Sequence, residues 1–182
     1  MADEVFIVPL KRFDVAKERL RRGGVENVTR LASELATAVI QSCAPRQVIV
    51  LSESSDVTRF ALDLGVEVLK SDATTLNEAV QSAYERLRKR FDRIIVVHGD
   101  LREPHGLAQF EPDVGVTIVT DYRSRGTNVL VVPTDLEFHF RYGEDSAGKH
   151  RDEAERLGVL CRMVTDSPWR FDVDEPSDVT RP

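Results

Sequence analysis

The chain has 182 residues, of which 41% are apolar, and its formal net charge is −6. This size can bury one substantial core, so we expect a single domain over residues 1–182. The acidic balance argues against a nucleic-acid binder that relies on a basic face. The start of the chain carries neither a secretory signal nor a membrane-spanning run, so we expect a cytoplasmic protein with no membrane partner.

Strand and helix patterns alternate along the chain. Strands are predicted at 5–9, 47–51, 66–69, 94–97, 114–120, 127–132 and 159–164, and helices at 27–44, 56–64, 75–90 and 146–157. Thr75 and Glu78 have the spacing of a capping box. The alternation predicts an α/β fold in which a mainly parallel, mixed sheet carries helices on both faces.

The segment 10–22 follows the first strand and is dense in cations. In α/β proteins this position often contacts phosphate, but GxGxxG and Walker patterns are absent, so side chains would have to do so. Lys11 and Arg19 are the candidates. The alternative is an amphipathic helix whose charges face water, and this is the interpretation we favour for Arg21 and Arg22.

Asp100 follows the branched apolar run 94–97 after only His98 and Gly99. Ligands of open α/β sheets bind beyond the carboxyl ends of the strands, so this carboxylate is a candidate for the site. It could equally cap the next segment or fill a turn. Asp172 and Asp174 would point to one side of an extended segment and could bind Mg²⁺ together with Asp100. An ordinary acidic surface loop, with Pro176 starting a last helix, explains them as well.

Small and hydroxyl residues recur at predicted element starts in the second half of the chain. Gly126 and Thr127 lie at the start of one strand, and Gly143 and Ser146 lie at the start of a helix; amides and hydroxyls of this kind suit a phosphate. Gly126 could instead serve only a turn, and Ser146 only a helix N-cap. The two cysteines and four histidines lack metal-site spacing, so we expect free thiols and hydrogen-bonded structural histidines.

Taken together, these blocks resemble the 2-phospho-L-lactate guanylyltransferases of coenzyme F420 biosynthesis, a family in which some members use phosphoenolpyruvate or 3-phosphoglycerate. The blocks occur in the family's order and span nearly the whole chain. They are Val8-Pro9-Leu10-Lys11, Ala16 to Leu20, Leu76-Asn77-Glu78-Ala79, Gly99-Asp100-Leu101, Gly126-Thr127-Asn128, Tyr142-Gly143 with Ser146 and His150, and Asp172 to Asp178.

The resemblance implies a nucleotide-diphospho-sugar transferase (glycosyltransferase-A-like) fold and a GTP-dependent reaction that releases pyrophosphate. It further implies that Asp100, Asp172 and Asp174 bind Mg²⁺, and that Lys11, Lys17 and Arg19 bind the triphosphate. Asn77 would lie near the nucleotide, and Thr127, Gly143 and Ser146 would hold the phosphorylated acid. Metal and cations would supply most of the catalysis, because the acceptor phosphate is already a nucleophile.

The chain differs from the family pattern at Asp145, where a second glycine is common. The carboxylate would lie close to an incoming phosphate. Two alternatives therefore stay open: a nucleotidyltransferase of the same fold that acts on another phosphate acceptor, and a nucleotide-binding module with a degenerate acceptor site.

Overall fold

The computed structural model describes residues 3–180, which form a seven-stranded sheet in the order β3-β2-β1-β4-β6-β5-β7. Every neighbouring pair is parallel except those of β6, which runs antiparallel to β4 and β5. The predicted mixed, mainly parallel sheet is confirmed. The strands are β1 (Glu4–Pro9), β2 (Gln47–Ser52), β3 (Glu67–Lys70), β4 (Arg93–Val97), β5 (Val116–Thr120), β6 (Thr127–Pro133) and β7 (Cys161–Val164).

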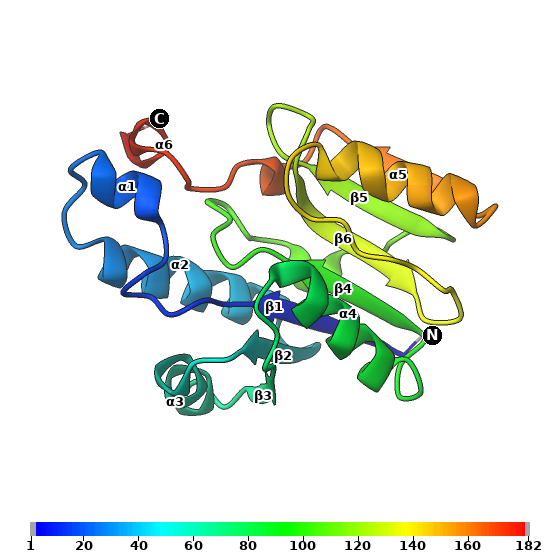
Figure 1. Cartoon of the computed structure of the whole chain (residues 1–182), viewed down its shortest axis with the longest axis horizontal. Helices are drawn as coiled ribbons and strands as arrows, with labels where there is room; N and C mark the ends of the chain where they lie inside the picture. The colour runs from blue at the N-terminus through cyan, green and yellow to red at the C-terminus, as the bar shows by residue number, and fades with distance from the viewer. Residues whose placement is uncertain (1–2, 181–182) are drawn as a thin grey trace.

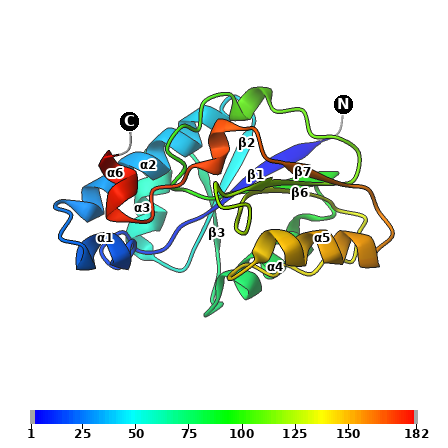
Figure 2. The same cartoon turned by 90° about the horizontal axis from the view of Figure 1, so that it is seen from above.

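Helices cover both faces of this sheet, as predicted: α4 and α5 lie on one face, and α2 lies on the other (Figures 1 and 2). The helices are α1 (Glu18–Arg22), α2 (Val28–Cys43), α3 (Ser55–Asp63), α4 (Leu76–Leu87), α5 (Ser146–Arg156) and α6 (Pro176–Thr180), with 3₁₀ turns η1 (Leu107–Gln109) and η2 (Pro168–Arg170). Within residues 3–180, no helix is long and apolar enough to cross a membrane.

Strand β4 is buried on both faces, which explains its unbroken apolar sequence. Ile94 and Val96 join the core under α4 and α5, where Tyr84 also packs. Ile95 and Val97 point the other way, into the core under α2 and α3. Two cores thus fix the orientation of β4, and therefore the place where the chain leaves the sheet at its carboxyl end.

Local signals near the helix starts were partly right. The capping box is confirmed, because Thr75 Oγ1 accepts from the Glu78 amide at 3.3 Å and the Glu78 carboxylate accepts from the Thr75 amide at 3.2 Å. The amphipathic helix considered as an alternative for the segment 10–22 is present only at Glu18–Arg22.

Arg21 shows why the segment before α1 is not helical. We expected its guanidinium to lie on a solvated face, and this is wrong. The guanidinium donates to the carbonyls of Phe13 at 2.7 Å and Ala16 at 3.1 Å. These bonds hold the loop folded back against the helix. Arg22 is exposed and pairs with Glu18, as expected for a solvated face.

The start of α6 packs against the end of α1. A Cβ atom on Gly23 would lie 2.2 Å from Cγ of Pro176, so only glycine permits this approach. Beneath it, Leu20 and Val173 pack on Val28 of α2. This contact fixes the segment that carries Asp172 and Asp174 over the carboxyl edge of the sheet.

We predict that Gly23→Ala lowers the free energy of unfolding by about 2 kcal/mol, because overpacking against a rigid ring costs on the order of 1–3 kcal/mol. Urea denaturation of Gly23→Ala, Pro176→Ala and the double variant measures this effect. In the Pro176→Ala background the cost of Gly23→Ala should fall by about half or more. Equal costs in both backgrounds would show that the clash with Pro176 is not the cause.

Candidate active site

The carboxyl end of β4 meets the C-terminal segment through a short antiparallel bridge between Leu101 and Asp172. The Arg102 amide donates to the Phe171 carbonyl at 2.8 Å, and the Val173 amide donates to the Asp100 carbonyl at 3.0 Å. Backbone hydrogen bonds therefore place Asp172 beside Asp100, although the two residues are far apart in the sequence.

Arg170 holds the same segment to the loop between β5 and β6. Its guanidinium donates to the carbonyls of Asp121 at 2.9 Å and Tyr122 at 3.0 Å, and to the Ser124 hydroxyl at 2.9 Å. The rings of Tyr122 and Phe171 stack with centroids 6.3 Å apart. The segment that carries Asp172 is thus anchored on two sides.

Lys17 lies between two of the predicted acidic residues. Its backbone adopts the left-handed conformation, with φ 60°, immediately before α1, and its side chain is only 10% exposed. The ammonium donates to Asp100 and, at 3.3 Å, to Asp174. Arg19 donates to the other oxygen of Asp174 at 2.8 Å. Two predicted cations and two predicted carboxylates therefore come together; strained backbone of this kind is often found at functional sites.

The charges in this cluster shift one another's pKa values. Burial opposes the charged form of Lys17, but Asp100, Asp174 and Asp172 outweigh it and raise the lysine pKa. Burial also opposes ionisation of Asp100, yet Lys17 and His98 hold its pKa below the ordinary value. Asp172 behaves differently: burial and the charge of Asp100 raise its pKa. The positive charge near the two aspartates therefore favours ionisation of Asp100 but is not enough to do the same for Asp172.

The donor set fits one divalent cation, although not through all three predicted aspartates at once. Within residues 3–180, no three acidic, histidine or cysteine side chains are arranged as a metal site. Asp174 is instead bound by Lys17 and Arg19. Asp100 and Asp172 remain a close pair, and Oδ1 of Asp100 is buried with no hydrogen-bond partner among the described atoms. Carboxylate oxygens of this kind are the ligands that Mg²⁺ prefers.

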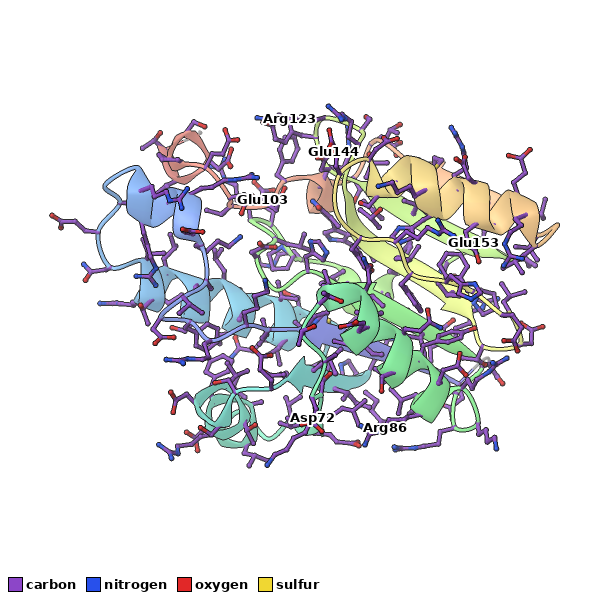
Figure 3. All side chains as sticks on the ribbon, in the orientation of Figure 1. Asp72, Arg86, Glu103, Arg123, Glu144 and Glu153 are labelled. Carbon is purple, nitrogen blue, oxygen red and sulfur yellow. The ribbon has the colours of Figure 1, made fainter. Side chains whose placement is uncertain are left out.

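A second cluster joins the β5–β6 hairpin to α5. The Ala147 amide donates to the Arg125 carbonyl at 2.9 Å, and the Ser146 hydroxyl donates to Thr127 Oγ1 at 3.2 Å. Ser146 is therefore not a helix N-cap; that position is occupied by Asp145. Figure 3 shows Arg123 and Glu144, from the two loops that meet here, at the same edge of the molecule.

His150 completes this cluster as a neutral side chain. Its Nε2 accepts from the Arg141 amide at 2.9 Å, so the proton lies on Nδ1, which donates to Thr127 Oγ1 at 3.1 Å. Burial, assisted by the nearby charge of His98 and Lys149 and opposed by Glu153, lowers the pKa of His150 to about 4. Thr127 Oγ1 accepts two hydrogen bonds, so its own hydrogen is left to donate elsewhere.

The remaining predicted residues lie around these two clusters. Asn77 holds the backbone of Tyr142, accepting from its amide at 2.6 Å and donating to its carbonyl at 3.1 Å. Gly143 follows with φ 119°, a conformation open chiefly to glycine. Lys11 is exposed in the loop after β1. A Cβ atom on Gly99 would lie 2.3 Å from the Leu10 side chain, so glycine lets this loop pass close to the end of β4.

Asp145 takes the conformation that glycine adopts without strain, with φ 54°. Its carboxylate lies over Gly148, where an added Cβ atom would come within 3.0 Å of Oδ2. The absence of a side chain on Gly148 thus makes room for the acid at this position.

Sequence reasoning missed two residues between the clusters, His98 and Tyr142. Their rings lie 5.5 Å apart, and Tyr142 also packs edge-on against His150 at 4.8 Å. The His98 amide donates to the Asn128 carbonyl at 3.0 Å, which continues the β4–β6 pairing. The available signal was position: His98 lies two residues before Asp100, and Tyr142 directly precedes Gly143.

Comparison with known protein families matches residues 4–181 to the family described as guanylyl transferase CofC like. The chain belongs to this family. The family is one of nucleotidyltransferase enzymes, and this chain is a guanylyltransferase of the CofC type.

Curated relatives of this chain carry guanylyltransferase names. The phosphoenolpyruvate guanylyltransferase of Chloroflexus aggregans is 28% identical over 185 residues, covering 92% of this chain and 91% of the relative. The 2-phospho-L-lactate guanylyltransferase of Methanothermobacter thermautotrophicus is 26% identical over 196 residues, covering 95% and 81%.

Solved structures share the fold at lower identity. A protein described as a nucleotide-diphospho-sugar transferase from Desulfovibrio desulfuricans G20 superposes with a TM-score of 0.79 at 16% identity, covering 98% of this chain and 85% of the other. A nucleotidyl transferase from Methanothermobacter gives 0.63 at 16% identity, covering 98% and 94%. The predicted nucleotide-diphospho-sugar transferase fold of this CofC-like chain is confirmed.

The depressed pKa of His150 predicts a stability change with pH. The folded state binds the proton with a pKa of about 4 and the unfolded state with one of 6.5, so stability is fully present above pH 6.5 and is lost as the pH falls toward 4. Between pH 7 and pH 5 this residue should remove about 2 kcal/mol from the free energy of unfolding.

Urea denaturation at both pH values of the wild type, His150→Gln and, as a control, His105→Gln measures this contribution. His105 is exposed, so its variant should keep the wild-type loss. His150→Gln should lose less stability than the wild type over the same pH range. A loss of the same size in His150→Gln would show that other groups cause the pH dependence.

Proposed function

We propose that this guanylyltransferase joins GMP from GTP to the phosphate of a three-carbon acid, as a step in coenzyme F420 biosynthesis. A phosphate oxygen of the acid attacks the α-phosphorus of GTP, the bond from that phosphorus to the β-phosphate oxygen breaks, and pyrophosphate leaves. Phosphoenolpyruvate is the first acceptor to test, because the relative from Chloroflexus aggregans is named for this substrate. 2-Phospho-L-lactate, for which the relative from Methanothermobacter is named, is the second.

The observation that carries this proposal is the juxtaposition of the two clusters at one edge of the sheet. The first cluster presents Lys17 and Arg19 beside Asp100 and Asp172, which suits a triphosphate with its cation. When bound, Mg²⁺ would be held by Asp100 and Asp172 and would neutralise charge on the triphosphate. Lys11, exposed after β1, would add a further cation from the neighbouring loop.

The second cluster suits the acceptor. Thr127 has a hydrogen left to donate, and His150 and Ser146 fix the direction of its hydroxyl. The amide of Gly143 adds an unhindered donor on a neighbouring loop. Asn128 of β6 connects the clusters directly, since it follows Thr127 and its side chain donates to the Trp169 carbonyl at 3.0 Å and to Asp172 at 3.5 Å.

These residues need to position two anions rather than to remove a proton. A phosphate monoester is ionised at neutral pH and attacks without a general base. The barrier comes from bringing it to the α-phosphate and from the charge that develops on the leaving pyrophosphate. Lys17 and Arg19 therefore act by stabilising charge, and Thr127 acts by orienting the acceptor.

The experiment that tests the proposal measures pyrophosphate release from GTP, ATP and CTP with phosphoenolpyruvate, 2-phospho-L-lactate, 3-phosphoglycerate or no acceptor, with Mg²⁺ or with EDTA. Release that requires GTP, Mg²⁺ and one acid is the expected result. Release only with another nucleotide or another phosphate would favour a different acceptor. GTP binding without release under any condition would favour a degenerate nucleotide-binding module.

Asp100→Asn should reduce turnover on the order of 100-fold while the protein stays folded, because it removes a cation ligand and a partner of Lys17. Binding of Mn²⁺, followed by electron paramagnetic resonance, should weaken in parallel. Asp113→Asn is the matched control, since this carboxylate is 56% exposed and pairs only with Arg162 among the described contacts. Unchanged Mn²⁺ binding in Asp100→Asn would remove this residue from the cation site.

Thr127→Val should raise the KM for the acid by about 10-fold or more and leave the KM for GTP within about twofold, because a hydrogen bond to an anion is lost. Thr127→Ser keeps the hydroxyl and should stay close to the wild type. Steady-state kinetics with each substrate varied in turn measures both constants. Equal increases in the two KM values would contradict the proposed division between nucleotide and acceptor clusters.

A further inference from the structure

Buried polar atoms without a hydrogen-bond partner gather at the carboxyl edge of the sheet. Among the described residues, five side-chain atoms of this kind occur, and four lie at or beyond strand ends on this edge: His98 Nε2, Asp100 Oδ1, Thr120 Oγ1 and Tyr142 Oη. An unpaired buried polar group costs about 1–3 kcal/mol, so a cluster of them indicates a place where a ligand completes the bonding. The cation proposed above accounts for Asp100 but not for the other three atoms.

Tyr142 is held rigidly where it can serve such a ligand. Asn77 binds both polar groups of its backbone, and the His150 ring packs against its ring with centroids 4.8 Å apart. His150 is in turn bonded to Thr127, and Gly143 is the next residue in the chain. The phenol therefore borders the residues assigned to the acceptor, and its unpaired hydroxyl is not a consequence of a loosely held side chain.

His98 packs against Tyr142. Its ring lies 5.5 Å from that of Tyr142, and its backbone is fixed by pairing with Asn128. It lies two residues before Asp100, between the proposed cation site and the Tyr142 ring. The rings that carry the two unpaired atoms, Nε2 of His98 and Oη of Tyr142, thus pack against each other, and the Tyr142 ring also packs against His150 of the acceptor cluster.

The chemistry of the two groups selects the ligand. Burial raises the pKa of the Tyr142 phenol, so its hydroxyl keeps its proton and donates. An imidazole nitrogen that carries a hydrogen, as Nε2 of His98 can, donates as well. Two donors next to a proposed phosphate-binding region match a second group of the acceptor that carries oxygen lone pairs, and a carboxylate presents two oxygens for two donors.

We propose that Tyr142 and His98 bind the carboxylate of the acceptor and make the enzyme select phosphorylated acids over other phosphate monoesters. This inference rests on the proposed function, since it concerns the acceptor of the same reaction. Asn77 is then a positioning residue that acts through the Tyr142 backbone. Its predicted place near the nucleotide is replaced in this proposal by a place behind the acceptor.

A matched pair of ligands tests the proposal. 2-Phospho-L-lactate and isopropyl phosphate differ only in that a methyl group replaces the carboxylate, and phosphoenolpyruvate serves as a second acid. Their dissociation constants are measured by titration calorimetry with Mg²⁺ present, which requires no turnover. The wild type should bind at least one acid about 10-fold or more tightly than isopropyl phosphate.

Tyr142→Phe and His98→Leu should each weaken binding of the acid by about 10-fold and change binding of isopropyl phosphate by less than about twofold. His98→Gln, which keeps an N–H donor at a similar position, should restore part of the affinity. Tyr84→Phe is the control for loss of a buried phenol. Its hydroxyl is already paired with the Pro133 and Leu136 carbonyls, so the preference for the acid should not change.

The outcomes separate this inference from the proposed function. Equal weakening of both ligands in Tyr142→Phe would show a structural role, and unchanged binding would show no contact; either result overturns the inference even if pyrophosphate release is observed. Selective weakening for the acid supports the inference even if no pyrophosphate is released, a result that would overturn only the proposed reaction. A wild type that does not distinguish the acids from isopropyl phosphate also overturns the inference.

Discussion

The candidate site depends on two backbone hydrogen bonds that join the end of β4 to the C-terminal segment. The Leu101–Asp172 bridge makes Asp172 a neighbour of Asp100, and both carboxylates lie near the largely buried side chain of Lys17. Without this bridge, Asp172 and Asp174 would be an ordinary acidic loop. Arg170 and the Gly23–Pro176 contact serve the same constraint, because each fixes one side of the segment. Much of the packing around the carboxyl edge thus holds the C-terminal segment in place against the end of β4.

The sheet topology divides the site into two parts. Strands β1 and β4 are parallel, so the cationic segment 10–22 and Asp100, which follow them, lie at the same edge of the sheet. Strand β6 is antiparallel to β4 and begins at that edge with Thr127 and Asn128. A strand that starts where its neighbour ends brings its first residues next to the last residues of that neighbour. The proposed acceptor groups therefore lie beside the carboxylates without a long loop between them, and His98 and Tyr142 lie at the boundary.

Sequence patterns predicted the features that depend on residues close together in the chain. The strands, the capping box at Thr75 and the place of Asp100 at a strand end follow from periodicity and side-chain chemistry over a few residues. The fold of 10–17 did not, because it depends on Arg21 reaching back to two carbonyls. The partners of Asn77 and Ser146 were also beyond such patterns, since Tyr142 and Thr127 are distant in sequence. The family resemblance named residues that the fold brings to one edge of the sheet, but it did not show that Lys17 lies between Asp174 and Asp100.

The bridge to the C-terminal segment also sets an order in time. All seven strands of the described sheet precede residues 171–174 in the chain, so during synthesis the sheet can begin to form before this segment has emerged. Lys17 and Asp100 both precede this segment in the chain, so their ion pair requires no residue of it. The candidate site is completed only when the last segment crosses the end of β4. Asp172 and Asp174 are therefore the last of the candidate site residues to join it.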